Sequence, residues 1–211
     1  MSDSIPLNLT DETAVQPGRS DAIANRQRIL AVAKELFASQ GPTAVNMSDI
    51  VQAANVGRGT LYRHFPNKGE LCLALIDEQI AEFQNEVLHL LRQMTADQET
   101  AVAKLTAFLD ALVFFTEAHT PLLREAQRQG IHYFDNKVTP QFWQHATVSG
   151  LLQTAVAQNE LSPTINTTYL ADVLLSALNA QLFHFQREER GLTPEAISAN
   201  IRQLVLQLQT G

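Results

Sequence analysis

The chain has 211 residues, of which 45% are hydrophobic and 18% charged, and its net charge is −7. This composition excludes a fibrous or intrinsically disordered chain and fits an ordinary globular protein with a core of its own. The single cysteine, Cys72, excludes an internal disulfide framework and fits a reducing compartment. The start MSDSIPLNLTDETAVQPG lacks the features of a secretion signal, and no later apolar run could span a bilayer. We therefore expect a cytoplasmic protein without a membrane segment.

The charge is distributed unevenly along the chain. Residues 19–68 carry seven basic and three acidic side chains, and this net charge of +4, set against −7 for the whole chain, leaves −11 for the rest. A basic module on an acidic body is expected where one end of a protein faces a polyanion. Chance clustering of charges on solvated faces would give the same count.

The N-terminal part begins with an arm and two predicted helices. Residues 1–20 have no apolar period and are expected to form a flexible arm. In NRQRILAVAKELFASQG, apolar residues recur at steps of three and four, and Gly41 ends this first helix before Pro42. Asn46 can cap a short second helix, with Asp49 three residues later as in a capping box.

A third helix is predicted within VGRGTLYRHFPNKGEL, after a sharp turn at Asn55, a residue type that enters the left-handed region easily. Gly57 takes the N-cap position and Pro66 ends the helix. Leu61 and Phe65 share the inward face, because helical positions four apart lie one above the other. The positions that look outward are Arg58, Gly59, Tyr62 and Arg63.

Two short helices joined by a tight turn and braced by a longer helix form a helix-turn-helix, whose second helix is sized for the major groove of DNA. Arginine suits guanine edges, a helix N-terminus attracts phosphate, and Gly59 removes a side chain that would keep the backbone away from the bases. A tight helical pair with a merely solvated basic face would show the same pattern.

The rest of the chain is expected to be helical near residues 68–94, 98–118, 121–129, 139–159, 166–188 and 194–209, with breaks that contain Thr, Pro, Gly or Asn. No alternation of the β type persists over a useful length. The predicted fold class is therefore all-α. A three-helix helix-turn-helix domain at residues 21–67 is followed by a larger helical domain at residues 68–211.

The stretch ILAVAKELFASQGPTAVNMSDIVQAANVGRGTLYRHFPNKGEL resembles the DNA-binding domain of the TetR family of transcriptional regulators, with its pattern G…T…I…A…V…GTLY-x-x-F-x-x-K-x-x-L. The resemblance implies a homodimer with an N-terminal domain for a double-stranded DNA operator and a larger domain for dimerisation and a small-molecule effector. We expect a repressor that its effector releases from a pseudo-palindromic operator; activation stays open. The alternative is an acidic α-helical ligand-binding or scaffolding protein without operator binding.

Position by position, the resemblance implies roles for residues of the DNA-binding domain. The candidates for base contacts are Arg58, Gly59 and Tyr62, with Ser48 as a weaker one. The candidates for phosphate contacts are Asn46, Thr60, His64 and Lys68. Three residues depart from the family's pattern: Asn55, where glycine is usual, Gly57, where Ser or Thr usually caps, and Pro42, where an aromatic residue is common. The helix that begins near Lys68 joins the two domains, so we expect it to transmit effector binding.

No catalytic, cofactor or metal site is predicted. The chain has no glycine-rich phosphate loop, nucleophile elbow or HExxH motif, so we expect no enzyme activity. Its histidines lack metal-ligand spacing, and only His184 and Glu188 form an i, i+4 pair. Cys72 lies on the apolar side of its predicted helix, which indicates a buried hydrophobe rather than a redox sensor.

Aromatic residues of the larger domain are candidates to line an effector cavity: Phe83, Phe108, Phe115, His119, Trp143 and Phe183. Such residues are usually core when taken singly, but together they exceed what a thin helical bundle needs. A cavity lined by a few of them would suit an apolar or aromatic small molecule. Asp110 and Glu117 would favour a cationic ligand if they point inward, and otherwise mark a solvated face.

The last two predicted helices carry apolar stripes that are wide enough for two packing partners, one inside the chain and one across a two-fold axis. The expected dimer interface contains Leu174, Leu178, Ile197, Ile201, Leu204, Val205 and Leu208. Alternatively, these helices only close the core of their own chain.

Overall fold

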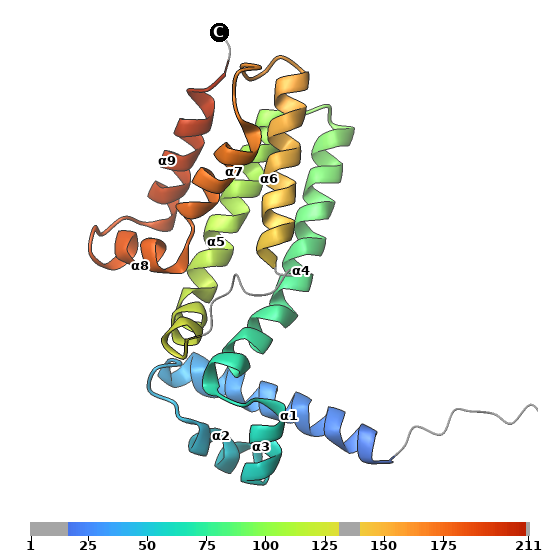
Figure 1. Ribbon diagram of the computed structural model, residues 1–211, viewed down its shortest axis with the longest axis vertical. Helices are drawn as coiled ribbons and strands as arrows, with labels where there is room; N and C mark the ends of the chain where they lie inside the picture. Colours follow the sequence, from blue (N-terminus) through green and yellow to red (C-terminus); the bar gives the residue numbers. More distant parts are fainter. Residues whose placement is uncertain (1–16, 131–139, 210–211) are drawn as a thin grey trace, which may run out of the picture.

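The computed structural model describes residues 17–130 and 140–209, and in these ranges all regular structure is helical apart from one isolated bridge. The prediction of an all-α fold is confirmed. Figure 1 shows a small helical domain at one end and an elongated bundle of the remaining helices above it. The helices are α1 (Pro17–Gln40), α2 (Met47–Ala54), α3 (Arg58–His64), α4 (Lys68–Ala96), α5 (Ala101–Arg128), α6 (Pro140–Ala157), α7 (Thr167–Ser176), α8 (Ala180–Glu188) and α9 (Pro194–Leu206).

The small domain, which we call the head, has its own hydrophobic core. Ile29, Ala33 and Phe37 of α1 pack with Ile50 of α2 and Leu61 of α3, and each is at most 6% exposed. The same cluster includes the first turns of α4, with Leu71, Cys72 and Leu75, and the end of α5, with Ala126. The head is therefore packed against both long helices and does not hang from a linker.

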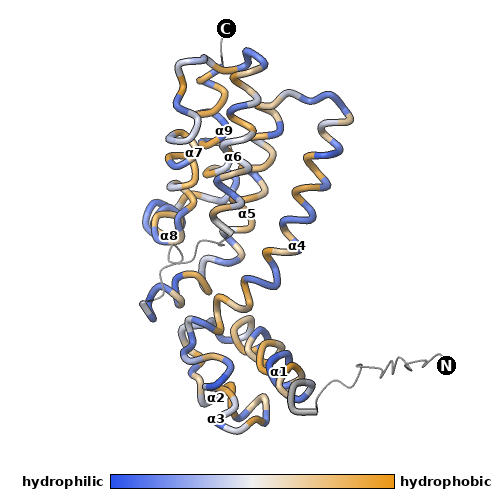
Figure 2. The backbone as a smooth tube through the Cα atoms, turned by 45° about the vertical axis from the view of Figure 1, so that its right-hand side comes forward, coloured by the Kyte–Doolittle hydropathy of each residue, from blue (hydrophilic) through white to orange (hydrophobic). Residues whose placement is uncertain are grey.

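The bundle, which we call the body, is built around α5, which packs against α4, α6, α8 and α9. In Figure 2, hydrophobic and hydrophilic stretches alternate along α4, as expected for a helix with one buried face. The carboxylate of Glu160 accepts hydrogen bonds from the backbone N–H groups of Ala101 (2.9 Å) and Val102 (2.8 Å). These bonds satisfy two donors at the start of α5 and fix the loop after α6 to it.

Three helix boundaries differ from the prediction. Helix α1 begins at Pro17, because proline is well suited to the first turn of a helix, so residues 17–20 belong to a helix. The rest of the predicted arm, residues 1–16, lies outside the described residues. Helix α5 continues through Pro121, where a break was predicted, since the turns after it are buried against the head. The helix predicted at 166–188 is divided, because the side chain of Asn179 caps a new helix by accepting from Gln181 N (2.9 Å).

Within the described ranges, no helix is both long enough and apolar enough to cross a membrane.

Candidate nucleic-acid interface and effector cavity

The turn between α2 and α3 has the geometry that the sequence predicts. The Asn46 side chain caps α2 by accepting from Ser48 N (2.9 Å) and Asp49 N (3.2 Å), while Asp49 Oδ2 accepts from Asn46 N (2.8 Å). Asn55 is in the left-handed conformation with φ 49° and ψ 50°, and Gly57 caps α3 without a side chain. The predicted capping box and sharp turn are confirmed: the capping box fixes the start of α2, and the turn at Asn55 sets the direction in which α3 leaves α2.

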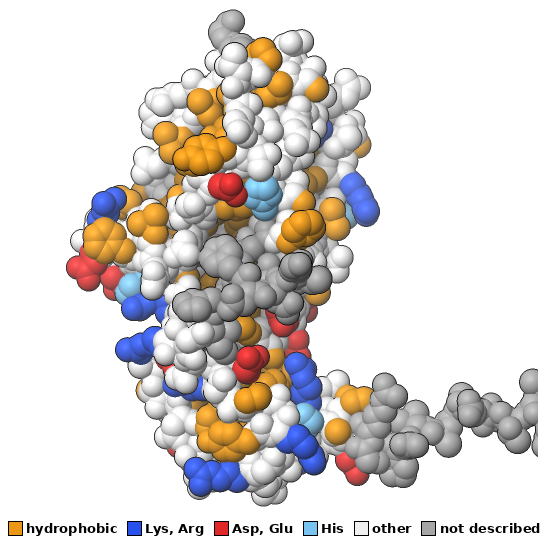
Figure 3. Space-filling view, in the orientation of Figure 1, with side chains coloured by type: hydrophobic (Ala, Val, Ile, Leu, Met, Phe, Trp, Pro, Cys, Tyr) orange, Lys and Arg blue, Asp and Glu red, His pale blue; other side chains and the backbone are white. Residues whose placement is uncertain are grey.

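Helix α3 is held by one face and exposed on the other. Leu61 (0% exposed) and Phe65 (2%) anchor it in the core of the head. Arg58 and Arg63 are exposed, and the Arg58 guanidinium lies over the ring of Tyr62, 6.0 Å from its centroid. Figure 3 shows Lys and Arg side chains gathered at the lower end of the molecule, over α2 and α3. This outward face offers hydrogen-bond donors and positive charge on a rigid support.

Gly59 lies on the same face, and the protein itself has no need of a glycine there. A Cβ atom built on Gly59 would meet no atom within 4 Å. Alanine would favour the helix at this position, because glycine is about 1 kcal/mol less favourable in a helix interior. A requirement for glycine would therefore have to come from a partner that approaches the backbone of α3 closely.

The other predicted DNA contacts differ in how accessible they are. Asn46 and Ser48 are exposed at the start of α2, whereas Thr60 is only partly exposed. His64 is also partly buried, and its Nε2 atom is covered by the chain without a hydrogen-bond partner in the described residues. Contacts of these residues with DNA stay predictions, and the covered nitrogen of His64 is not presented to a phosphate in this structure.

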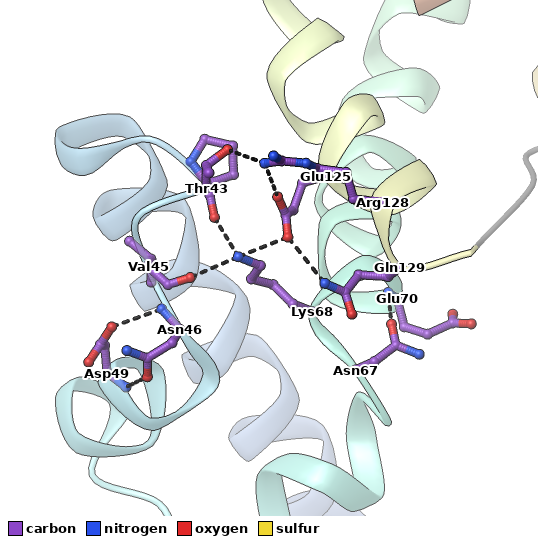
Figure 4. Close-up of polar contacts among 11 residues, drawn as sticks. Thr43, Val45, Asn46, Asp49, Asn67, Lys68, Glu70, Glu125, Arg128 and Gln129 are labelled. Carbon is purple, nitrogen blue, oxygen red and sulfur yellow. Dashed lines mark hydrogen bonds and ion pairs between the residues drawn. The ribbon is translucent and has the colours of Figure 1, made fainter. Parts of the chain in front are cut away.

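Lys68 has its partners inside the protein. Its Nζ donates to the carbonyl oxygens of Pro42 (2.8 Å) and Val45 (3.0 Å) and lies 2.9 Å from Oε1 of Glu125, as Figure 4 shows. An ammonium has three N–H donors, so these partners use all of them. The Lys68 side chain is 13% exposed and that of Glu125 is 4% exposed. These contacts give Lys68 an internal role in this structure, and its contact with a phosphate stays a prediction.

We call this set of contacts the latch: Lys68 at the start of α4, Glu125 near the end of α5, and the carbonyls of Pro42 and Val45 in the loop before α2. Two further residues attach to the carboxylate of Glu125. Gln129 Nε2 donates to Oε1 (3.3 Å), and Arg128 NH1 lies 3.7 Å from Oε2 and donates to Thr43 Oγ1 (3.4 Å). Sequence reasoning missed Glu125, because a glutamate in a helix carries no signal of a partner far along the chain.

The body contains a partly open cavity of about 730 Å³. Leu112 and Phe115 line it from the middle of α5, and Leu123 and Gln127 from its last turns. Ile76 of α4, residues of α6, α7 and α8, and the segment between α7 and α8 supply the other described lining residues. This size is within the range of small-molecule sites. Of the aromatic residues predicted for an effector site, only Phe115 is among the described lining residues.

The other predicted aromatic residues pack behind the cavity. Phe83 stacks on Phe115 with 4.4 Å between ring centroids, and Trp143 meets Phe83 (6.2 Å) and Phe108 (5.5 Å) edge to face. Phe108 and Phe183 are fully buried in the core of the body. These residues therefore support the cavity from the core, and direct contacts of Phe83, Phe108, Trp143 or Phe183 with an effector stay predictions.

His119 is buried next to this aromatic cluster, 5% exposed and stacked on Phe115 with 4.0 Å between centroids. Its Nδ1 contacts the carbonyl oxygen of Phe115 (2.6 Å), and its Nε2 contacts the side-chain amide of Gln79 on α4. Burial lowers the pKa of His119 below its usual value, and the hydrogen bond to Phe115 offsets part of this effect. His119 is thus a neutral link between α4 and α5.

Asp110 and Glu117 do not line the cavity. Asp110 accepts from Ser198 and pairs with Arg202 on α9. Glu117 forms a bidentate pair with Arg187 on α8, with both distances 2.9 Å. Both carboxylates therefore tie α5 to the C-terminal helices and do not support a cationic ligand.

Most of the predicted dimer residues lie inside the single chain. The residues that are at most 8% exposed are Leu174, Leu178, Ile197, Ile201 and Val205. They face the core because α9 packs along α5 and α7 packs along α6, so these five residues belong to the core of their own chain, and a dimer interface on these helices stays a prediction. Leu204 (58% exposed) and Leu208 (36%) remain on the surface, next to Leu206 (46%).

Metal and redox chemistry have no support in the part of the chain that is described. No group of three or more His, Cys, Asp or Glu residues there is arranged to hold a metal ion. Cys72 is fully buried, and burial raises the pKa of its thiol to about 12. The interpretation of Cys72 as a buried hydrophobe is confirmed.

Comparison with known proteins agrees with the geometry of the head. Residues 29–75 match the model of the bacterial regulatory proteins of the tetR family. The HTH-type transcriptional regulator SAR2658 of Staphylococcus aureus strain MRSA252 is 33% identical over 178 residues, which cover 84% of this chain and 90% of the relative. The HTH-type transcriptional regulator SAUSA300_2515 of Staphylococcus aureus strain USA300 is 32% identical, again over 84% of this chain and 90% of the relative.

Solved structures show the same fold over nearly the whole chain. A TetR-family transcriptional regulator from Pectobacterium atrosepticum superimposes with a TM-score of 0.64 at 21% identity, over 92% of this chain and 98% of that one. A transcriptional regulator from Saccharomonospora viridis, solved in complex with choline, superimposes with a TM-score of 0.61 at 15% identity, over 90% of this chain and 99% of that one. The described head, the fold and the sequence identity agree, and the chain belongs to the TetR family of helix-turn-helix transcriptional regulators.

Proposed function

We propose that the chain is a homodimeric repressor that binds a pseudo-palindromic DNA operator and leaves it when a small molecule occupies the cavity of the body. The outward face of α3 carries this proposal. It presents Arg58, Gly59 and Tyr62 exposed to solvent, with the Arg58 guanidinium over the Tyr62 ring, on a helix fixed from behind by Leu61 and Phe65. Arg58 is suited to guanine, and a bare Gly59 lets the bases approach. Such a regulator acts on DNA, so we propose that it is located in the cytoplasm.

Membership of a family of regulators speaks against both catalysis and the alternative of a helical scaffold without operator binding. It leaves open whether the chain represses or activates. Control of DNA binding by an effector is supported by a helix that the cavity and the head share. Leu123 and Gln127 of α5 line the cavity, whereas Leu122, Glu125 and Ala126 of the same turns face the head. A ligand that prefers one position of these turns also biases the position of α3.

A salt-dependent gel shift on the DNA upstream of the chain's own gene tests operator binding. Arg58→Ala is compared with Arg92→Ala, since Arg92 is an exposed arginine of α4 outside the head and the change in net charge is the same. We expect Arg58→Ala to cost about 1 to 3 kcal/mol on the operator and less on random DNA. Arg92→Ala should match the wild type. Equal losses for the two variants, or no shift by the wild type, would contradict the proposal.

The proposed dimer surface is the outer face of α9. Its exposed residues include the uncharged Ala199, Asn200 and Gln203, with Leu204 and Leu206 on either side, while the charged Glu195 and Arg202 lie toward the Leu206 edge. An uncharged centre with exposed leucines and a charged rim is typical of protein–protein interfaces. A hollow of about 440 Å³ between α5 and α9, which includes Phe114 and Leu206, lies next to this face and can receive side chains of a second copy.

Two glutamates test the placement of this interface. The double variant Leu204→Glu with Leu206→Glu should be monomeric in sedimentation equilibrium and should lose operator binding, because one head makes too few contacts. Leu88→Glu changes a leucine of α4 that is 40% exposed and serves as the matched control, which should stay dimeric. Ile201 is unsuitable for this test, since it is 4% exposed in the core and a glutamate there would unfold the chain. A dimeric double variant would show that the interface lies elsewhere.

A further inference from the structure

The wall of the body cavity combines apolar and uncharged polar side chains. Leu112 and Phe115 supply apolar surface from α5, while amide groups come from Gln127 of α5, Gln144 of α6 and Asn179, the N-cap of α8, whose amide oxygen also accepts from Gln181 N. An amide group both donates and accepts hydrogen bonds, so it can pair with a hydroxyl, a carbonyl or another amide. The site is therefore built for a molecule that has an apolar frame and several polar groups.

The described wall carries few charged groups. None of the described lining residues is a lysine or an arginine. The carboxylate of Asp172 lies beside a histidine, with its Oδ1 3.1 Å from Nε2 of His145. Asp172 is also 61% exposed, so water weakens its attraction for a ligand cation. Among the described lining residues, an anionic ligand therefore meets no counter-charge and a cationic ligand meets only this screened carboxylate, so either ion loses hydration that the wall does not replace.

We propose that the cavity takes an uncharged amphipathic molecule, whose apolar frame packs on Leu112 and Phe115 and whose oxygen or nitrogen groups bond to the amides of Gln127, Gln144 and Asn179. This inference rests on the proposed function only in that the cavity is the effector site. It is more specific than the apolar or aromatic ligand that the sequence predicts. A ligand with polar groups can hydrogen-bond to the amides of the wall. A pure hydrocarbon cannot, and it would leave these amides buried without hydrogen-bond partners.

Three fluorescent probes with the same frame test the charge preference directly: 1-pyrenebutanol, 1-pyrenebutanoate and 1-pyrenebutylammonium. Binding is measured on the protein without DNA, from quenching of Trp143, the chain's only tryptophan. We expect the alcohol to bind at least about tenfold more tightly than either ion, a difference of about 1.4 kcal/mol. Equal or tighter binding of the carboxylate or the ammonium, or saturable binding of none of the three, would overturn the inference.

A variant pair shows that the probes occupy this cavity. Gln144→Lys places an ammonium in the wall, and we expect it to raise the affinity for 1-pyrenebutanoate at least about tenfold by supplying the missing counter-charge. Gln93→Lys makes the same change at an exposed position of α4 and should leave all three affinities unchanged. Equal responses of the two variants would show that the probes bind outside the cavity. Because no step uses DNA, a chain without operator binding still gives a valid order of affinities.

Discussion

Replacing Glu125 with glutamine keeps the shape of the side chain and removes the charge opposite Lys68. The two side chains are 4% and 13% exposed, and Oε1 lies 2.9 Å from Nζ. Removing one partner of a buried ion pair typically costs about 3 to 5 kcal/mol, because the other charge stays desolvated. The carbonyls of Pro42 and Val45 still accept from Lys68 in the variant. We therefore expect Glu125→Gln to lower the free energy of unfolding by about 3 kcal/mol, the lower end of that range.

Urea unfolding followed by circular dichroism, at one protein concentration for all variants, measures this loss. Arg128→Gln is the matched control, because Arg128 is 60% exposed and 3.7 Å from the same carboxylate. It should cost less than about 1 kcal/mol, as exposed ion pairs do. A double-mutant cycle with Lys68→Met should give a coupling free energy of at least about 1 kcal/mol. A loss for Glu125→Gln no larger than that for Arg128→Gln, or a coupling below about 0.5 kcal/mol, would refute the latch.

The same lysine separates the latch from a phosphate contact. A phosphate contact by Lys68 in each of two subunits would contribute about −1.8 to the slope of log affinity against log salt concentration, at about −0.9 per contact. A latched Lys68 contributes nothing to that slope. We therefore expect Lys68→Met to keep the wild-type salt slope on operator DNA, even if its overall affinity falls. A slope that becomes less steep by about 1.8 would restore the phosphate role.

Three further predictions test single side chains. Gly59→Ala should raise the free energy of unfolding by up to about 1 kcal/mol, since its Cβ meets nothing within 4 Å, yet lower operator affinity at least about tenfold in anisotropy titrations. Unchanged affinity would mean that DNA does not approach α3 there. Because burial holds the pKa of His119 below its ordinary value of 6.5, the unfolded chain takes up the proton first, and stability falls as pH drops through and below 6.5. His119→Gln should flatten that dependence in urea titrations, and an unchanged slope would exclude His119 as its source. Cys72, with its pKa raised to about 12, should react with iodoacetamide at pH 8 only after unfolding, and native labelling at the unfolded rate would contradict its burial.

The head could be predicted in detail because its signals are local. Asn46 finds its partners two and three residues away, and Asn55 and Gly57 act through their own backbone conformation. Leu61 and Phe65 are one helical turn apart on a seven-residue helix and its cap, so their common face follows from the period. None of these features of the head depends on where the body lies.

The body shows where a periodic pattern stops being informative. The spacing of Ile197, Ile201 and Val205 indicates that one face of α9 is buried, but it contains no information about the surface that covers it. In the structure that surface is α5 of the same chain. The neighbouring Leu204 is also an aliphatic residue, yet it is 58% exposed. Only the packing of the helices distinguishes a core leucine from one available to a second copy.

Two helix boundaries were wrongly predicted for a related reason: Pro121 does not end α5, and Asn179 begins a new helix where one continuous helix was expected. Pro121 lacks one backbone donor, which predicts a break, but Leu122, Glu125 and Ala126 gain burial against the head when the helix continues. The burial of these residues stabilises the continuous helix by more than the hydrogen bond that Pro121 cannot donate. In the cavity wall, Gln127, His145 and Asp172 likewise carry no motif, and only the meeting of α5, α6 and α7 brings them together.

The latch changes which helix can move the head. The sequence suggests α4 as the element that transmits effector binding, because it starts in the head and runs into the body. Lys68 at its start is bound at once to the loop before α2 and to Glu125, so the first turn of α4, that loop and the last turns of α5 move as one unit. Since Leu123 and Gln127 of those turns line the cavity, an effector bound in the proposed site would contact this unit directly. A displacement of α4 alone would have to break a buried ion pair at about 3 kcal/mol or more. Joint movement of α4 and the end of α5 keeps the pair intact and is the less costly path from cavity to operator.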